Sequence, residues 1–260
     1  MKVFFLGVWM TPECGETVSF VIELDTGERI LVDTANNPVH RLISMGINPM
    51  DISDVILTHI HGDHLSGLPM LLFHRINYLP LIGRKTEKDI NIIASNKCLE
   101  SAMEYLRIPY PGLAASEKFT KTTLTSIPTT IKYNDQYEFA FFESKHIPLT
   151  TGFILTDNAS GKRLMYSGDT TFSESVLELA NGVDCLIHDV AATKRFSMIS
   201  KGHCLCEEIT PAISNGNIKL FIPVHRMPYY YDHIDEYLAG FEGLQNTKLL
   251  IPNDGDVVII

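Results

Sequence analysis

Three histidines and one aspartate fall within the stretch Thr58-His59-Ile60-His61-Gly62-Asp63-His64. An apolar run over residues 55–57 precedes it and predicts a buried strand, and a second apolar run over 65–73 predicts a helix. We therefore expect the cluster on a strand-to-helix loop, where a rigid scaffold can present side chains to a ligand. Imidazole and carboxylate groups at this density favour binding of a Zn, Fe or Mn ion.

The composition is that of a globular protein. Of the 260 residues, 45% are hydrophobic and 20% are charged, which is ordinary for a soluble chain with a core of good size. We expect a single domain over residues 1–260. The sequence contains no run of about 18 apolar residues, so we expect no membrane span. The apolar run at residues 3–6 is too short for a secretory signal. A cytoplasmic location is the expectation.

Charge and cysteine content narrow the function classes. The net charge of −10 does not favour a nucleic-acid binder, which usually carries a basic face, although a metal centre would add local positive charge. The five cysteines are odd in number and scattered, so they predict buried thiols rather than a disulfide framework. Cys204 and Cys206 form a CxC pair, which alone is a weak metal signal.

Strands are predicted early in each half of the chain and helices later, with the halves meeting near Thr150. Helices are predicted over 38–45, 65–73, 97–106, 174–180, 207–213 and 234–244. Asn37, Asn96 and Ser173 are the expected caps of three of them. This pattern predicts an α+β fold in which two mixed sheets pack face to face with helices outside, a four-layer αββα sandwich.

Three further candidate ligands share one position, because His146, Asp169 and His225 each come directly after a predicted strand. If these strands run to a common edge, their end loops meet there and join the first cluster. Seven such side chains are too many for one tetrahedral ion, and they suit two ions that share a carboxylate and keep room for water. The seven are His59, His61, Asp63, His64, His146, Asp169 and His225.

The spacing in the first loop divides its ligands between the two ions. His59 and His61 lie two residues apart at a strand end, so they point the same way and can bind one ion. Asp63 and His64 lie one turn further on and can bind the other. Asp169 is the expected bridge, because a carboxylate has two oxygens. The remaining histidines with no matching context are predicted to be surface or core residues: His40, His74 and His233.

Five motifs carry a family resemblance. The stretch 58–64 matches THxHxDH, residues 167–170 match (S/T)GDT, and 186–191 look like LIHEAT with Asp189 in place of Glu. Residues 202–204 resemble a GHST loop, and 223–226 resemble a final-histidine motif. Together they resemble the metallo-β-lactamase-fold hydrolases, and within them the ribonuclease Z-like branch, over nearly the whole chain.

The resemblance implies an αββα sandwich with a two-zinc site at one edge and a homodimer. It assigns one ion to His59, His61 and His146, the other to Asp63, His64 and His225, and Asp169 to both. It also suggests His203 as a group near the scissile bond. Asp33 matches an aspartate that orients a ligand.

Departures from the family pattern argue against tRNA as the natural substrate. Family members that process tRNA carry a Gly- and Pro-rich arm in the interval between His146 and Asp169, whereas this chain has room there for one hairpin. The GHST loop has lost its hydroxyls, and residues 8–10 are Val-Trp-Met where the family often has small residues. The hydrolytic motifs themselves are intact.

The function we predict is that of a dinuclear metal-dependent hydrolase, a phosphodiesterase or ribonuclease Z-like enzyme that uses a two-metal-activated hydroxide. The cofactors are two divalent metal ions, Zn²⁺ first, with Fe or Mn as alternatives. Asp63 is expected to accept a proton from the water, and a protonated His203 to offset charge or protonate the leaving group. A small phosphodiester or ester is the expected substrate, with RNA among the candidates.

Other chemistries remain open at this stage. The same core serves hydrolysis of carboxylic esters, thioesters or lactones, as in glyoxalase II- or lactonase-like enzymes, and arylsulfatase-like cleavage. A di-iron redox or binding protein is a further alternative, but the chain shows no flavin-type domain to receive electrons. The run Tyr229-Tyr230-Tyr231 can either stack on a base or form a core or dimer contact.

Overall fold

The chain forms two seven-stranded sheets in the computed structural model, which describes residues 1–83, 89–116, 118–198 and 201–260. Unit 1 comprises residues 1–8, 15–125 and 253–259, and unit 2 comprises 9–14, 126–252 and residue 260. The halves meet near Thr125 rather than near the expected Thr150, because the strands between these positions pair within the second sheet.

The sheet of unit 1 has the order β14-β1-β2-β3-β4-β5-β6. Its strands are β1 (Lys2–Gly7), β2 (Ser19–Glu23), β3 (Arg29–Val32), β4 (Ile52–Leu57), β5 (Ile90–Ser95), β6 (Phe119–Leu124) and β14 (Val257–Ile259). Neighbours pair antiparallel from β14 to β3 and parallel from β3 to β6. Because β3 and β4 are parallel neighbours, the residues that follow them leave from the same edge of this sheet.

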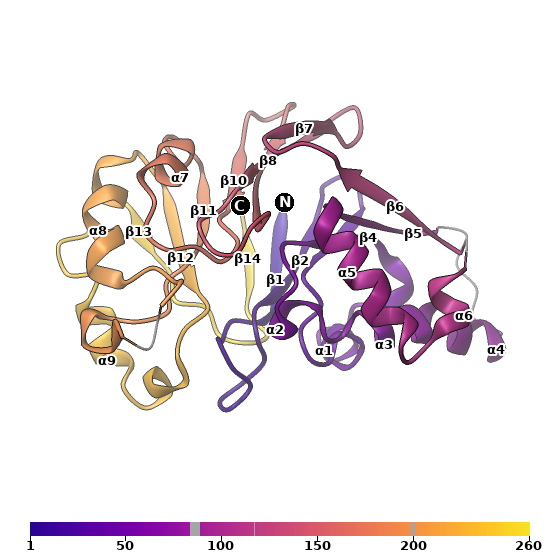
Figure 1. Ribbon diagram of the computed structural model, residues 1–260. Helices are drawn as coiled ribbons and strands as arrows, with labels where there is room; N and C mark the ends of the chain where they lie inside the picture. Colours follow the sequence, from indigo (N-terminus) through magenta and orange to yellow (C-terminus); the bar gives the residue numbers. More distant parts are fainter. Residues whose placement is uncertain (84–88, 117, 199–200) are drawn as a thin grey trace. The chain divides into compact units, whose positions relative to one another are not determined.

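Helices cover one face of this sheet (Figure 1). They are α1 (Pro38–Ser44), α2 (Gly62–Leu65), α3 (Leu68–Phe73), α4 (Leu79–Leu81), α5 (Asn96–Arg107) and α6 (Pro111–Ala114), with a π-helical turn at His74–Tyr78 and a 3-10 turn at Pro49–Asp51. Apolar side chains of α1, α3 and α5 form one buried core with those of β3, β4 and β5, among them Leu42, Leu71, Ala102, Leu31 and Val55.

Local signals in unit 1 mostly agree with the prediction. The Asn37 side chain accepts a hydrogen bond from His40 N at 3.3 Å, so it caps α1 as expected. The helix predicted over 65–73 is interrupted between α2 and α3, where a Cβ on Gly67 would lie only 2.2 Å from the carbonyl oxygen of Ala35. Asn96 opens α5 rather than capping it, because Ser95 occupies the cap position with extended backbone.

The sheet of unit 2 has the order β13-β12-β11-β10-β9-β8-β7. Its strands are β7 (Thr129–Lys132), β8 (Tyr137–Glu143), β9 (Thr151–Asp157), β10 (Arg163–Tyr166), β11 (Cys185–Asp189), β12 (Leu220–Val224) and β13 (Lys248–Leu249). Neighbours pair antiparallel from β7 to β10 and parallel from β10 to β13. Strands β8, β10, β11 and β12 therefore share one direction, and their carboxyl ends lie at one edge.

The helices of unit 2 lie beside this sheet (Figure 1). They are α7 (Glu174–Leu179), α8 (Cys206–Asn215) and α9 (Ile234–Ala239), with 3-10 turns η3 (Lys194–Phe196) and η4 (Pro228–Tyr231). One side chain from each helix, Val176, Ile209 and Tyr237, lies in a buried core together with Leu186 and Phe221 of the strands. The Ser173 side chain accepts from Val176 N at 3.4 Å, so the predicted cap of α7 is confirmed.

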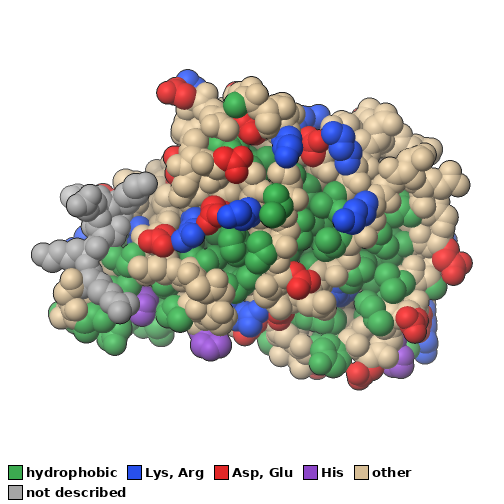
Figure 2. Space-filling view, turned by 180° about the vertical axis from the view of Figure 1, so that it is seen from behind, with side chains coloured by type: hydrophobic (Ala, Val, Ile, Leu, Met, Phe, Trp, Pro, Cys, Tyr) green, Lys and Arg blue, Asp and Glu red, His purple; other side chains and the backbone are tan. Residues whose placement is uncertain are grey.

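Two mixed sheets with helices confirm the predicted α+β class. The interval from residue 146 to 169, all of which is described, holds only the β9–β10 hairpin, so the predicted lack of an arm there is confirmed. No helix among the described residues is long and apolar enough to cross a membrane. Figure 2 shows acidic and basic side chains interspersed on the face that it displays, rather than gathered by sign.

Candidate metal centre

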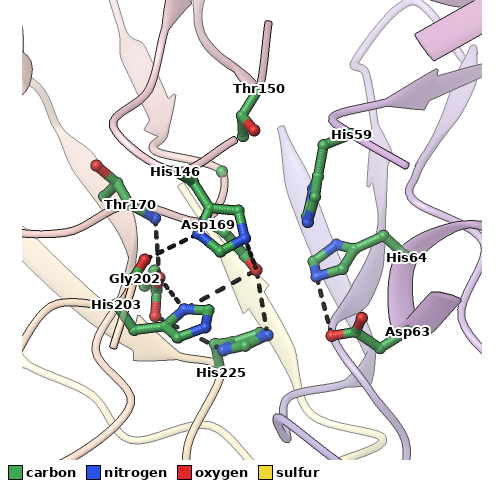
Figure 3. A network of polar contacts seen from close by, with 12 residues as sticks. His59, Asp63, His64, His146, Thr150, Asp169, Thr170, Gly202, His203 and His225 are labelled. Carbon is green, nitrogen blue, oxygen red and sulfur yellow. Dashed lines mark hydrogen bonds and ion pairs between the residues drawn. The ribbon is translucent and has the colours of Figure 1, made fainter. Parts of the chain in front are cut away.

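The first ligand set, which we define as His59, His61, Asp63 and His64, lies on the loop between β4 and α3 in unit 1. His59 and His64 are buried, and their ring centroids lie 4.2 Å apart. The rings of His59 and His61 lie 4.7 Å apart, centroid to centroid. The Nε2 atom of His64 lies 3.3 Å from Oδ2 of Asp63, toward which it points in Figure 3.

A single buried carboxylate supports two histidines of this set. Asp33 directly follows β3, and its Oδ2 lies 2.8 Å from Nδ1 of His64. Asp33 also accepts hydrogen bonds from the backbone N–H and the hydroxyl of Thr58, and the Thr58 Oγ1 lies 3.0 Å from Nδ1 of His59. Burial raises the pKa of Asp33, while its bonds to His64 and Thr58 oppose that rise. The predicted orienting role of Asp33 thus has a direct geometric basis.

The second ligand set, which we define as the candidate ligands His146, Asp169 and His225 together with the adjacent Asp189 and His203, belongs to unit 2. Its members follow or end strands β8, β10, β11 and β12, except His203, which precedes α8. Figure 3 shows three imidazole rings turned toward Asp169. Its Oδ2 lies 3.4 Å from Nε2 of His225, 3.9 Å from Nε2 of His146 and 3.9 Å from Nδ1 of His203. Four of these residues have ligand atoms within 4.8 Å of one another: Asp169, Asp189, His203 and His225.

Asp189 lies beside the rings of two histidines in this set. Its Oδ2 lies 2.7 Å from Nδ1 of His203 and also accepts the backbone N–H of Thr170 at 2.9 Å. Its Oδ1 lies 3.7 Å from Nδ1 of His225. His146 is oriented differently, because its Nδ1 lies 2.9 Å from the carbonyl oxygen of Gly202. In each case one ring nitrogen faces an oxygen of the protein, which determines how the other nitrogen is directed.

The backbone is strained at two positions of the site. Asp33 has φ +56° and His225 has φ +66°, in the left-handed region that side chains other than glycine rarely adopt. Both residues directly follow a strand, so the chain must turn sharply to present the side chain at the sheet edge. Such strain persists where the surrounding structure determines the conformation, and it is concentrated at functional sites.

The distances within each unit fit metal coordination. Two ligand atoms bound at about 2.0–2.1 Å to one tetrahedral zinc ion stand about 3.3 Å apart. The His64–Asp63 pair is separated by 3.3 Å and the His225–Asp169 pair by 3.4 Å, Nε2 to Oδ2 in both. Imidazole nitrogen and carboxylate oxygen are also the donors that Zn, Fe and Mn accept. One pair of candidate ligands in each unit therefore stands at a separation that fits binding to one divalent ion.

Sequence reasoning found most of these side chains but missed three supporting groups. Asp189 was noted in a family motif but was given no role, although it is the last residue of a buried strand and the other candidates also lie near strand ends. Thr58 and the Gly202 carbonyl were missed because hydrogen-bond partners across the fold leave no spacing signal. The buried-thiol interpretation is confirmed for Cys204 and Cys206, whose pKa values burial raises. His233 stacks on Tyr229 with 4.1 Å between centroids, which is a packing role.

Comparisons with known proteins agree with this geometry. A family model described as a beta-lactamase superfamily domain matches residues 13–226. The ribonuclease Z of Thermococcus sibiricus is 22% identical over 306 aligned residues, covering 99% of this chain and 96% of that protein. The metallo-beta-lactamase fold protein YhfI of Bacillus subtilis superposes with a TM-score of 0.78 at 16% identity, covering 99% of both chains. The short form of human tRNase Z has a TM-score of 0.74 at 18% identity, covering 100% of this chain and 99% of that one.

The family model spans most of both units, and the likeness to solved structures extends over the whole chain. The motif order and the positions of the candidate ligands are consistent with the full-length similarity to ribonuclease Z. The chain belongs to the beta-lactamase superfamily and has the metallo-β-lactamase fold, and it is similar to ribonuclease Z over nearly its whole length.

Proposed function

We propose that this protein is a hydrolase of phosphodiesters, of the ribonuclease Z-like type, that acts with two divalent metal ions. The observation that carries the proposal is the orientation of the histidines, whose Nδ1 atoms face carboxylate or carbonyl oxygens: Asp33 for His64, and Gly202 for His146. This is the arrangement of metal-binding histidines in general, and it directs Nε2 toward a metal. The relatives named ribonuclease Z support a phosphodiester as the bond cleaved.

The proposed ligands are the seven residues of the sequence motifs. One ion would be bound by His59, His61 and His146, the other by Asp63, His64 and His225, with Asp169 shared. The support for this division is the motif order together with the fit of each ligand set in its own unit to metal distances. Asp189 and Asp33 are proposed as supports of the ligands rather than as ligands.

Two side chains of the protein are proposed to accept and donate the protons of the reaction. When bound, divalent ions lower the pKa of a water molecule from about 15.7 toward about 7 and polarise the phosphoryl group. Asp63 is the proposed acceptor of the water proton. His203 is the proposed donor to the leaving oxygen, because its Nδ1 lies 2.7 Å from Oδ2 of Asp189, which orients the ring. The two groups would thus act as base and acid in one turnover.

Zinc is the metal we propose, because its tetrahedral preference matches the ligand separations above. Iron or manganese would accept the same donors. Elemental analysis of protein purified without added metal would distinguish them, and two equivalents of zinc per chain is the expected result. One equivalent or less at full activity would overturn the two-ion proposal.

A small phosphodiester is the proposed substrate, with RNA as one candidate. The single β9–β10 hairpin between His146 and Asp169 gives no arm there with which to grip a folded tRNA. We therefore expect turnover of bis-p-nitrophenyl phosphate and of short RNA, and weak cleavage of precursor tRNA. Lactone, thioester and p-nitrophenyl sulfate substrates run in parallel test the alternatives. Clear lactone turnover without phosphodiester turnover would overturn the phosphodiesterase proposal.

Substitution of the ligands gives the direct test. His61→Ala and Asp169→Asn should each lower kcat/KM by at least about 10³-fold and release metal, because each removes a ligand atom. His40→Ala is a matched control, since His40 is exposed on α1 and outside both ligand sets. Activity that survives both ligand substitutions would exclude the metal mechanism.

We also propose a homodimer in the cytoplasm. The support for the dimer is the family resemblance, and the support for a reducing compartment is that all five cysteines are thiols. Light scattering on a size-exclusion column should give twice the chain mass of 29.2 kDa. A monomer at micromolar concentration would contradict the dimer, and recovery with the membrane or secreted fraction would contradict the location.

A further inference from the structure

The chain that leads from Asp189 toward His203 is bonded to three parts of unit 2. Ala191 N donates to the carbonyl oxygen of Cys204 at 3.0 Å, and Cys206 N donates to that of Ala192 at 2.9 Å. Val190 N donates to Val224 O at 3.0 Å, and Met227 N donates to Ala191 O at 2.9 Å. Residues 190–193, which we call the linking segment, therefore bond to the backbone just after His203 and to the backbone on both sides of His225.

Two tyrosine hydroxyls attach to this linking segment. The Tyr237 hydroxyl, from α9, donates to the carbonyl oxygen of Val190 at 2.6 Å. The Tyr230 hydroxyl, from η4, accepts the backbone N–H of Thr193 at 2.9 Å and lies 2.8 Å from its Oγ1. The two ends of the linking segment are thus each held by one phenol.

Both phenols are themselves rigidly placed. Tyr230 and Tyr237 are fully buried, and their ring centroids lie 4.9 Å apart. Tyr237 packs edge to face on Phe241 at 5.2 Å, and Tyr230 packs on Tyr229 at 5.3 Å. Burial raises the pKa of both hydroxyls, so they stay protonated and keep their hydrogen bonds across the working pH range. Burial of Tyr230 also rules out base stacking for that member of the tyrosine run.

We propose that Tyr230 and Tyr237 are positioning residues for the reaction, which hold the linking segment so that Asp189 keeps His203 in its working orientation. The Asp189–His203 contact is short, 2.7 Å, and it joins two residues at opposite ends of a loop. A shift of the order of 1 Å at such a contact can cost about 10²-fold in rate. The effect on turnover rests on the proposed role of His203, whereas the effect on the loop does not.

The test removes one hydroxyl at a time, in the full-length metal-loaded protein. Tyr237→Phe and Tyr230→Phe keep the rings and delete only the hydrogen bonds. We expect amide hydrogen exchange in peptides covering 190–198 to quicken about fivefold, from loss of a buried hydrogen bond. We expect kcat on a phosphodiester to fall about tenfold with KM and metal content unchanged. Tyr137→Phe is the matched control, a buried tyrosine of β8 whose hydroxyl contacts Gln136 and not the linking segment.

A double variant separates positioning from general weakening. If the tyrosines act through His203, then Tyr237→Phe should lower kcat no further in a His203→Ala background, because residues that act as a unit are not additive. An equal tenfold loss in that background, an equal loss in Tyr137→Phe, or unchanged exchange at 190–198 would each overturn the proposal. Absence of phosphodiester turnover in the unmodified protein would overturn the proposed function instead, and the exchange measurement would then decide the positioning proposal alone.

Discussion

At the scale of single residues, the site depends on carboxylates that bind no metal in our assignment. Asp33 reaches His64 directly and His59 through the Thr58 hydroxyl. A buried carboxylate with these partners aligns two ring nitrogens at once. The same reasoning gives Asp189 its role toward His203 and His225 in the other unit.

Asp33→Asn should weaken metal binding by about 10- to 100-fold, which is the usual effect of losing the hydrogen-bond partner of a metal ligand. The amide keeps the size of the carboxylate but loses its charge and one of its acceptor oxygens. Metal competition with a chromogenic chelator measures the effect. Asp51→Asn provides the control, because Asp51 is half exposed and pairs with Arg29 away from the loop. Unchanged affinity in the Asp33 variant would show that the orientation of His64 does not depend on it.

At the scale of elements, two short features hold the first ligand set at its sheet edge. The parallel pairing of β3 with β4 brings Asp33 to Thr58. The break between α2 and α3 then packs Gly67 against the loop after β3, where its N–H donates to Thr34 O at 2.7 Å. The strand pair and the helix break together determine where His64 lies.

Gly67→Ala should destabilise the protein by more than about 2 kcal/mol, because a buried overlap with backbone cannot relax cheaply. The added Cβ would lie 2.2 Å from Ala35 O and 2.7 Å from Thr34 O. Gly62→Ala is the control in the same loop, since a Cβ there meets no atom within 4 Å. Urea unfolding measures both. Equal stability of the two variants would contradict the close approach.

The antiparallel part of the unit 1 sheet should depend on pH through Glu23. The hydrogen bond from Lys2 lowers the Glu23 pKa most, burial opposes this, and the bond from Arg29 lowers it further. A folded pKa below the unfolded value of about 4.3 means that the stabilisation is complete above that pH and is lost as the pH falls through the folded pKa.

Glu23→Gln should therefore cost about 1 kcal/mol at pH 7 and less at pH 3. Urea unfolding at the two pH values is the measurement. Asp135→Asn, which removes a fully exposed pair with Lys132, should change stability by less than about 0.5 kcal/mol at either pH. A Glu23→Gln cost that is as large at pH 3 as at pH 7 would show that the cross-strand contacts stabilise by packing rather than by charge.

At the scale of the whole molecule, both units carry ligands, and each unit has its own sheet and core. Ligand binding to the folded state alone stabilises by mass action, by about 4 kcal/mol at a thousandfold excess over Kd. Metal should therefore contribute to the stability of the molecule as well as to its chemistry.

Removal of metal with a chelator should lower the Tm by about 10 °C and abolish phosphodiester turnover, and added zinc should restore both. Differential scanning calorimetry measures the shift. Asp169→Asn should show a much smaller shift, because it lacks the proposed shared ligand. A chelator that abolishes activity without moving the Tm would indicate that the metal binds too weakly to contribute to folding.

The sequence by itself determined the fold class and supplied the seven ligands that we propose, because both rest on local signals. The HxHxDH stretch fills one loop, His146, Asp169 and His225 each follow a strand, and the strand and helix periods indicate an α+β chain. Only the tertiary structure decided which groups hydrogen-bond to the proposed ligands and to the backbone that supports them. Asp33 meets His64 across 31 residues, Gly202 meets His146 across 56, and Tyr237 meets Val190 across 47. Such partners are chosen by sheet pairing and loop packing, which act through space and leave no periodicity along the chain.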